Sequence, residues 1–233
     1  MKKLKYIITA AVLAAASLVS GFAETSNLTG KLETSLISNF TYQGQVLDSN
    51  PVVVPKLSLE YPLFEGGSLQ LSTEQVVGTR GSALYRSKYD FGLALSVGRF
   101  TVTPGFELRD FPNGKTSLQG INATQSVTGR ISFNDKGLLP VTLNPYVYLS
   151  RAVEPRGGTF YEVGVQPSLN LGKLNVGFPV AFGAGSSNYW TISNKDITYA
   201  FASAGVTLIY NVTDRFALKA SSILYNTDKT LGN

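Results

Sequence analysis

The stretch that decides the fold runs from Ser87 to Asp110 and reads SKYDFGLALSVGRFTVTPGFELRD. Its Gly98-Arg99 dipeptide puts glycine at the first central position of a two-residue turn, as a type II′ hairpin turn requires. Side chains alternate between the two faces of a strand, so folding the stretch at this turn gives one face of apolar pairs. These pairs are Val97 with Phe100, Leu95 with Val102, Leu93 with Pro104, Phe91 with Phe106 and Tyr89 with Leu108.

The opposite face of this hairpin is small and polar, and it is charged at its open end. Its pairs are Ser96 with Thr101, Ala94 with Thr103, Gly92 with Gly105 and Asp90 with Glu107. A soluble sandwich would bury the apolar face in its core, whereas a membrane barrel would turn the same face to lipid. The hairpin by itself fits both folds.

The same alternation predicts eleven strands along the chain. We expect them at residues 31–42, 52–61, 68–77, 87–97, 100–110, 124–133, 141–151, 163–171, 174–182, 197–210 and 215–225. The eighth and ninth form a second hairpin at Gly172-Lys173, with Leu169 opposite Val176 and Val163 opposite Phe182. Proline has no N–H for the ladder, so Pro55, Pro104, Pro167 and Pro179 predict local gaps in the pairing.

The lengths of the connections favour the membrane barrel. Long connections are expected at 43–51, 78–86, 110–123, 152–158 and 183–196, and short ones at 65–67, 98–99, 134–140, 172–173 and 211–214. This strict alternation is typical of outer-membrane barrels, which have long loops outside and short periplasmic turns. A Greek-key sandwich gives no reason for it. We therefore predict an all-β fold, a transmembrane antiparallel up-and-down β-barrel.

The number of strands is the open point of this prediction, because single-chain bacterial barrels have an even number. The chain ends in a polar stretch, residues 226–233, where an outside loop is due. We therefore expect twelve strands, the last of which is missing from this chain. A ten-stranded barrel is the alternative, in which one strand, such as 52–61 or 197–210, is misassigned.

Residues 1–23 have the pattern of a Sec-type signal peptide, and residues 24–233 are expected to form a single barrel domain. Three lysines precede an apolar run over residues 7–19, and Gly21 and Ala23 are small residues at a cleavage site. Removing the segment lowers the formal charge from +5 to +2, because it carries three lysines and no acid. We expect no nucleic-acid partner, since the remaining chain has no basic stripe to bind phosphates.

The chain contains no cysteine and no histidine, which removes the common nucleophile–base pairs and most transition-metal sites. We expect no enzymatic activity and no cofactor or metal. The paired carboxylates of Asp90 and Glu107 could serve as acid and base. Lys88 and Arg109 have the same inward parity, however, and we favour a salt-bridge cluster formed by all four residues.

This cluster of Lys88, Asp90, Glu107 and Arg109 is expected at the outer mouth of the lumen and is our candidate functional site. The other residues expected to line the lumen are Lys56, Glu60, Glu74, Arg130, Tyr146, Tyr148, Glu162, Arg215 and Lys219. Inward-facing charges of both signs are nearly balanced along the chain, so no strong ion selectivity is expected.

Residues 39–61, NFTYQGQVLDSNPVVVPKLSLEY, resemble the first hairpin of the TorF family of porins. That hairpin reads Ser-Asn/Asp-Tyr-x-Phe/Tyr-Arg-Gly, followed by a polar loop with a proline and then an apolar strand. The matching residues are Ser38, Asn39, Phe40, Tyr42, Gly44, Asp48 and Pro51, whereas Gln43 stands where the family usually has arginine. The resemblance implies a porin-like outer-membrane barrel, with no substrate and no catalytic residues to carry over.

The predicted function is passive diffusion of small polar solutes across the cell outer membrane, with the N-terminus in the periplasm. The expected partners are outer-membrane lipid, the barrel-assembly machinery during insertion, and the solutes themselves. The alternative is a non-conducting barrel that acts in adhesion or surface structure through its outside loops. A third possibility is a soluble, exported β-barrel that binds an apolar ligand.

Overall fold

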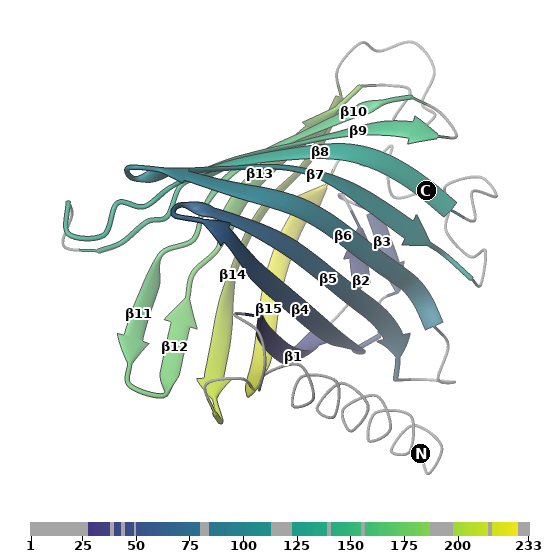
Figure 1. Cartoon of the computed structure of the whole chain (residues 1–233). Helices are drawn as coiled ribbons and strands as arrows, with labels where there is room; N and C mark the ends of the chain where they lie inside the picture. Colours follow the sequence, from purple (N-terminus) through teal and green to yellow (C-terminus); the bar gives the residue numbers. More distant parts are fainter. Residues whose placement is uncertain are drawn as a thin grey trace.

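The protein is a closed all-β barrel, as the computed structural model in Figure 1 shows. The structure describes residues 28–37, 40–42, 45–48, 50–79, 84–112, 123–138, 141–154, 157–186, 198–213 and 216–227. The strands are β1 (Thr29–Ile37), β2 (Phe40–Tyr42), β3 (Gln45–Asp48), β4 (Val52–Phe64), β5 (Gly67–Gly78), β6 (Leu84–Val97), β7 (Phe100–Asp110), β8 (Ala123–Phe133), β9 (Tyr146–Glu154), β10 (Thr159–Val165), β11 (Ser168–Leu171), β12 (Leu174–Gly177), β13 (Val180–Gly185), β14 (Thr198–Asn211) and β15 (Phe216–Thr227). No helix within these ranges has the length and apolar character needed to cross a membrane.

Eleven strand positions form the wall of the barrel in the described part of the chain. Strands β1, β4, β5, β6, β7, β8 and β9 follow one another as neighbours, and β10 with β11 forms one interrupted strand. Strands β12 and β13 likewise share one position, because both pair with β14. All eleven predicted strands therefore form, including those at 52–61 and 197–210, and the ten-strand alternative is wrong.

The barrel closes between its first and last strands, and this closing pair is parallel. Strand β15 pairs antiparallel with β14 on one side and parallel with β1 on the other, from Leu32 opposite Phe216 to Ile37 opposite Ser221. Strands that alternate in direction leave the first and the eleventh running the same way, so a parallel pair is a geometric necessity. The barrel is thus mixed rather than wholly antiparallel. The twelfth strand, which is expected to be missing from this chain, stays a prediction.

The predicted hairpin register is confirmed, including the gaps at the prolines. In β6 and β7, Val97 lies opposite Phe100, and the pairing continues to Ser87 opposite Asp110. Gly98 has a φ of 60°, the left-handed conformation that the first position of the turn requires. The ladder skips the residues around Pro104, and it breaks again at Pro167 and Pro179, where β10 and β13 separate from β11 and β12.

Several strand boundaries differ from the sequence prediction: β6 begins at Leu84 rather than Ser87, and β9 ends at Glu154 rather than Arg151. The first strand ends at Ile37, and the chain then forms the short hairpin of β2 and β3, a sheet of its own. The strand expected from Val141 begins only at Tyr146. The reason is local: the carboxylate of Asp135 accepts hydrogen bonds from the backbone N–H groups of Leu143 and Asn144, at 2.7 Å and 2.9 Å, so these groups do not join a ladder.

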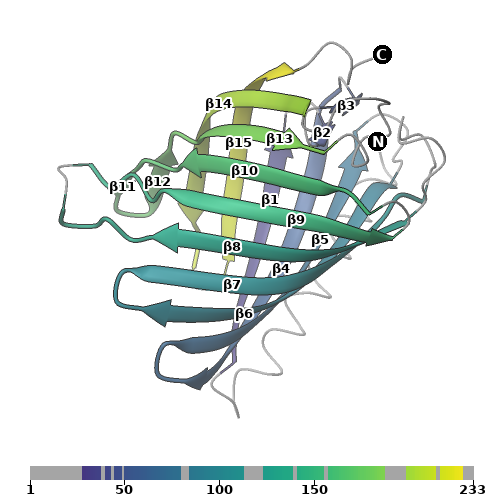
Figure 2. The same cartoon turned by 90° about the horizontal axis from the view of Figure 1, so that it is seen from above.

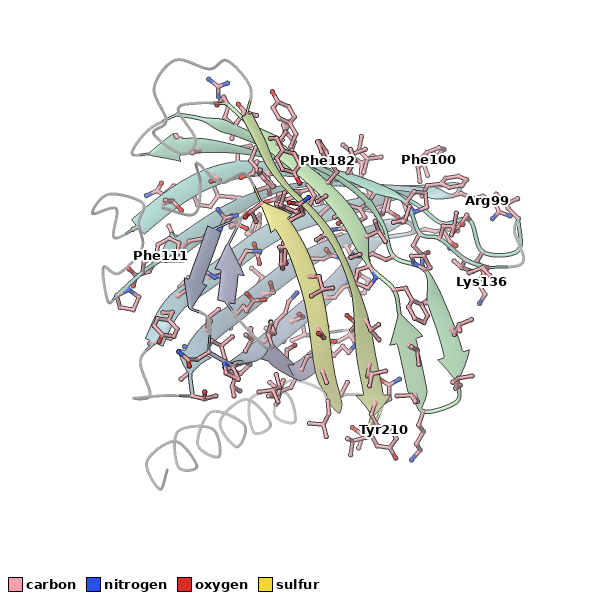
Figure 3. All side chains as sticks on the ribbon, turned by 180° about the vertical axis from the view of Figure 1, so that it is seen from behind. Arg99, Phe100, Phe111, Lys136, Phe182 and Tyr210 are labelled. Carbon is pink, nitrogen blue, oxygen red and sulfur yellow. The ribbon has the colours of Figure 1, made fainter. Side chains whose placement is uncertain are left out.

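These boundaries overturn the strict alternation of long and short connections. One end of the barrel, called the turn end here, carries the connections 65–66, 98–99, 134–145, 172–173 and 212–215; the other, called the loop end, carries 38–51, 79–83, 111–122, 155–158 and 186–197. The connection 134–145 is long although it lies at the turn end, and 79–83 and 155–158 are short although they lie at the loop end. Figure 3 shows Arg99, Phe100 and Lys136 together at the turn end and Phe111 far from them.

The two surfaces of the wall differ sharply in polarity. Among the described residues, thirty-one large apolar side chains are strongly exposed, and most of them have the outward parity predicted from the sequence. Phe91, Val163 and Phe182 are each close to half exposed. Figure 2 shows β6 to β10 side by side in one curved part of the wall.

Inward glycines make room for aromatic rings that lie against the wall. A Cβ atom added to Gly183 would lie 2.6 Å from the Phe201 ring, whereas one added to Gly129 would meet no atom within 4 Å. We expect Gly183→Ala to lower the free energy of unfolding by about 1–3 kcal/mol, because the ring has to move. Gly129→Ala is the control: Gly129 shares the outward face of β8 with Val127 and Ile131, where an added methyl group meets no ring, so this variant should be close to neutral. Urea unfolding of both variants measures the difference, and equal stabilities would contradict this packing.

Candidate functional site

The lumen of the barrel holds three water-accessible cavities that adjoin one another. Their volumes are about 490, 480 and 660 Å³. The first and third share Asn144, Gln166 and Asn175 in their walls, and the second and third share Arg130. The lumen therefore holds open space rather than a filled core, as expected for a barrel of more than eight strands, and its walls carry both polar and apolar side chains.

The predicted mouth cluster of Lys88, Asp90, Glu107 and Arg109 forms, and it lies toward the loop end. The Nζ atom of Lys88 lies 3.1 Å from Asp90 Oδ1 and 2.9 Å from Glu107 Oε2, and Arg109 pairs with the other oxygen of Glu107. The hydroxyl of Ser72 donates to Asp90 at 2.9 Å. Register alone brings these residues together, because Asp90 lies opposite Glu107 and Lys88 lies opposite Arg109.

The mouth cluster is extended by a pair that includes a residue missed by the sequence analysis. Arg86 pairs with Glu74 across β5 and β6, beside the mouth cluster. Glu74 was predicted to line the lumen, whereas Arg86 was assigned to a connection. The position of Arg86 could have indicated its role, because it lies two residues before Lys88 on the same strand and therefore faces the same side.

Strands β8, β9 and β10, which follow β6 and β7 along the wall, carry a second polar group. Tyr146 donates a hydrogen bond to Glu162 Oε1 at 2.7 Å, and the guanidinium of Arg130 stacks over the Tyr146 ring at 4.0 Å from its centroid. Arg130 lies opposite Thr103 of β7, so this group continues the polar inner surface from the strands that hold the mouth cluster.

Aromatic side chains form a buried cluster on the same wall as Glu162. The ring centroids of Tyr148 and Phe160 are 6.5 Å apart, those of Phe160 and Phe201 are 6.3 Å apart, and those of Phe201 and Tyr225 are 5.4 Å apart. Phe160 and Phe201 are almost fully buried, so these rings mainly pack on one another.

A second buried apolar cluster lies toward the loop end and was not predicted. It consists of Val52, Val54, Val76 and Phe111, with Tyr85 packed against it. Residues 52–54 are three consecutive valines, so their pattern did not distinguish the inward from the outward face. Together with the mouth cluster, the two apolar clusters make the loop end the more densely packed part of the lumen.

The structure places most of the remaining predicted lumen residues in the walls of the cavities. Lys56, Glu60, Arg130 and Tyr148 line the second cavity, and Glu74 and Lys219 line the first. The predicted lumen residue Arg215 lies outside the described residues, as does the signal peptide predicted at 1–23.

The connection 134–145 is held in a fixed shape at the turn end. Arg99 Nη1 donates to the carbonyl oxygens of Asn134 and Lys136, at 3.2 Å and 2.9 Å. Desolvation acts to raise the pKa of Asp135, but the backbone N–H groups of Asn144 and Leu143 outweigh it and lower that pKa. The ionised carboxylate of Asp135 therefore organises this connection and is not directed at the lumen.

The chemistry that these groups support is polar binding. Within the described ranges, no group of three or more histidine, cysteine, aspartate or glutamate residues could hold a metal ion. The carboxylates of Asp90 and Glu107 both contact the ammonium of Lys88, which is the arrangement of a salt-bridge network. The lumen thus presents fixed charges and hydrogen-bonding groups to water and to small polar molecules.

The fold defines the class of this protein, an all-β barrel with an apolar outer face and a polar, partly open lumen. Comparison with protein-family models, with curated proteins and with solved structures finds no match to this chain.

The pair of Glu107 and Arg109 should contribute strongly to stability, because their side chains are only 2% and 5% exposed. We expect Arg109→Met to destabilise the barrel by about 3–5 kcal/mol, since it removes one partner of a buried ion pair. Lys31→Met is the matched control: Lys31 pairs with Glu33 at 3.2 Å but is 44% exposed, so the loss should stay below about 1 kcal/mol. Urea unfolding compares the two variants, and equal losses would contradict a desolvated mouth cluster.

Proposed function

We propose that this chain is an outer-membrane β-barrel whose lumen lets small polar solutes diffuse passively. It would lie in the cell outer membrane with its N-terminal end on the periplasmic side, after export by a signal peptide and insertion by the barrel-assembly machinery. The resemblance of residues 39–61 to the TorF family of porins agrees with this proposal.

The apolar outer surface is the observation that carries the membrane assignment. Soluble monomers seldom expose a continuous apolar patch larger than a few hundred square ångströms. Here strongly exposed large apolar side chains are found on every strand position of the barrel wall. Lipid is a suitable environment for such a surface, and closing the barrel leaves few unpaired backbone groups facing the lipid. The lengths of the connections, by contrast, do not support the membrane assignment, because long and short connections do not alternate strictly.

The open space in the lumen supports diffusion rather than a purely structural role. Its cavities carry hydroxyl, carboxamide and charged side chains of both signs, and the first cavity is also lined by apolar residues such as Ile37, Val54 and Val76. The polar groups can exchange hydrogen bonds with a passing solute and favour neither cations nor anions strongly.

A non-conducting barrel is the second candidate, and the packing of the loop end favours it. The mouth cluster, the Glu74–Arg86 pair and two buried apolar clusters all occupy that part of the lumen. If they block the passage completely, the protein would act through its loops in adhesion or surface structure.

Conductance in planar lipid bilayers distinguishes these two candidates. We expect the purified, refolded barrel to produce stepwise current increases with weak ion selectivity, because the lumen charges are nearly balanced. A barrel that inserts into the bilayer and carries no current would rule out the diffusion channel and leave the structural role.

Arginine substitution on the outer face tests the membrane assignment. Phe91→Arg should destabilise the barrel in phospholipid bilayers by about 2–4 kcal/mol, because it places a charge against the lipid interior. Gln70→Arg is the matched control: Gln70 lies beside Gly92 and lines a lumen cavity, where an arginine remains hydrated. Urea unfolding measures both. A Phe91→Arg variant as stable as the wild type would exclude lipid from this face.

A further inference from the structure

We propose that a pocket rich in carboxamides at the turn end of the lumen binds polyhydroxylated solutes, and acidic saccharides more tightly than neutral or basic ones. The proposal rests on the proposed function in one respect, since it takes the ligand to be a solute that passes through the lumen. The binding itself requires only that the pocket be reached from the turn end.

Five carboxamide side chains from four separate segments converge on this pocket, which is the third cavity described above. They are Asn134, Asn144, Gln166, Asn170 and Asn175. The pocket also contains hydroxyl groups, among them those of Thr101 and Ser132, and Phe133 is the single apolar residue among the described ones that line it. No other described cavity of the lumen gathers as many carboxamides.

The pocket is accessible because the wall is incomplete beside it. Strand β11 has a strand partner on one side only, β12, and β12 continues the sheet to β14. On its other side, the connection 134–145 approaches as irregular chain rather than as a strand, and Gln166 donates its N–H to Leu143 at 2.7 Å. Figure 1 shows the β11–β12 hairpin standing apart from β8 and β9.

Several of these carboxamides keep hydrogen-bonding capacity for a ligand. Asn170 and Asn175 are a cross-strand pair in the hairpin, and both line the pocket. The Nδ2 group of Asn144 makes a long contact of 3.4 Å with the Gln166 carbonyl, and Asn134 uses only its Oδ1 atom, which accepts from the Lys136 N–H at 3.1 Å. A carboxamide has a donor NH₂ group beside an acceptor oxygen. Two neighbouring hydroxyl groups of a saccharide can match this pair, because one can accept from the NH₂ group while the other donates to the oxygen.

The charge of the pocket favours an acidic ligand. Arg130 and Lys136 line it, and no carboxylate does so among the described residues. The nearest acid in sequence, Asp135, accepts hydrogen bonds from the backbone N–H groups of Leu143 and Asn144 and is not among the residues that line the pocket. A carboxylate on the saccharide can pair with the Lys136 ammonium, whereas a protonated amine would be repelled.

Ligand-observed NMR titrations of the full barrel in detergent micelles test the proposal, with glucuronate, glucose and glucosamine as probes of matched size. We expect the affinity to decrease in that order. The double variant Asn170→Ala/Asn175→Ala should weaken glucuronate and glucose binding by about three- to tenfold, because each probe loses hydrogen bonds to neutral groups. Lys136→Gln should reduce the preference for glucuronate over glucose, because it removes one of the two cations that line the pocket, and it should leave glucose binding unchanged.

Gln70→Ala is the matched control, because it removes a lumen carboxamide from a different cavity. Equal weakening by Gln70→Ala, or no binding of any probe to a barrel shown to be folded, would overturn the proposal. The titration does not depend on conduction, so the two proposals fail separately. If the barrel binds the saccharides but carries no current in bilayers, the saccharide-binding proposal stands and the diffusion-channel proposal is rejected. If it carries current but binds no saccharide, only the saccharide-binding proposal is rejected.

Discussion

Backbone hydrogen bonding between neighbouring strands, carried around the whole wall until it returns to its start, is the constraint on which this structure depends. Each strand of the wall has a partner on both sides except β11, which pairs with β12 alone, and the β1–β15 pair closes the barrel. Within the paired strands, the alternation of side chains then follows. Every second residue faces the lumen and the others face outward, so the register of one hairpin is enough to assemble the mouth cluster.

The two ends of the lumen differ in chemistry because different side chains follow the same alternation. Toward the loop end, charged side chains form ion pairs that are packed between apolar clusters. Replacing either partner of such a buried pair lowers the stability of the protein strongly. Toward the turn end, amides, hydroxyls and the cations Arg130 and Lys136 line open space, and the carboxylate of Asp135 shapes the chain. The two ends of the lumen thus differ in whether their charged groups are paired with groups of opposite sign.

The sequence was a sound guide wherever one face of a strand was wholly apolar. The hairpin of β6 and β7 folds in the predicted register, and so does that of β11 and β12, because Gly98 and Gly172 fix their turns. Prediction was wrong where a polar side chain competed for backbone groups, as Asp135 does before Tyr146. It was also blind where both faces were apolar, as at residues 52–54. Arg86 was missed because the predicted strand began at Ser87, whereas β6 begins at Leu84.

The parallel contact between β1 and β15 has a consequence for the order of events in folding. It joins segments near opposite ends of the described chain, so the loop that must close to form it spans nearly all the other strands. Parallel ladders are slightly less stable per residue than antiparallel ones. Hairpins such as β6–β7 need only their own turn, whereas this contact needs every other strand already in place. The barrel therefore has a built-in last step, a seam that joins only after the rest of the wall has curved round to meet itself.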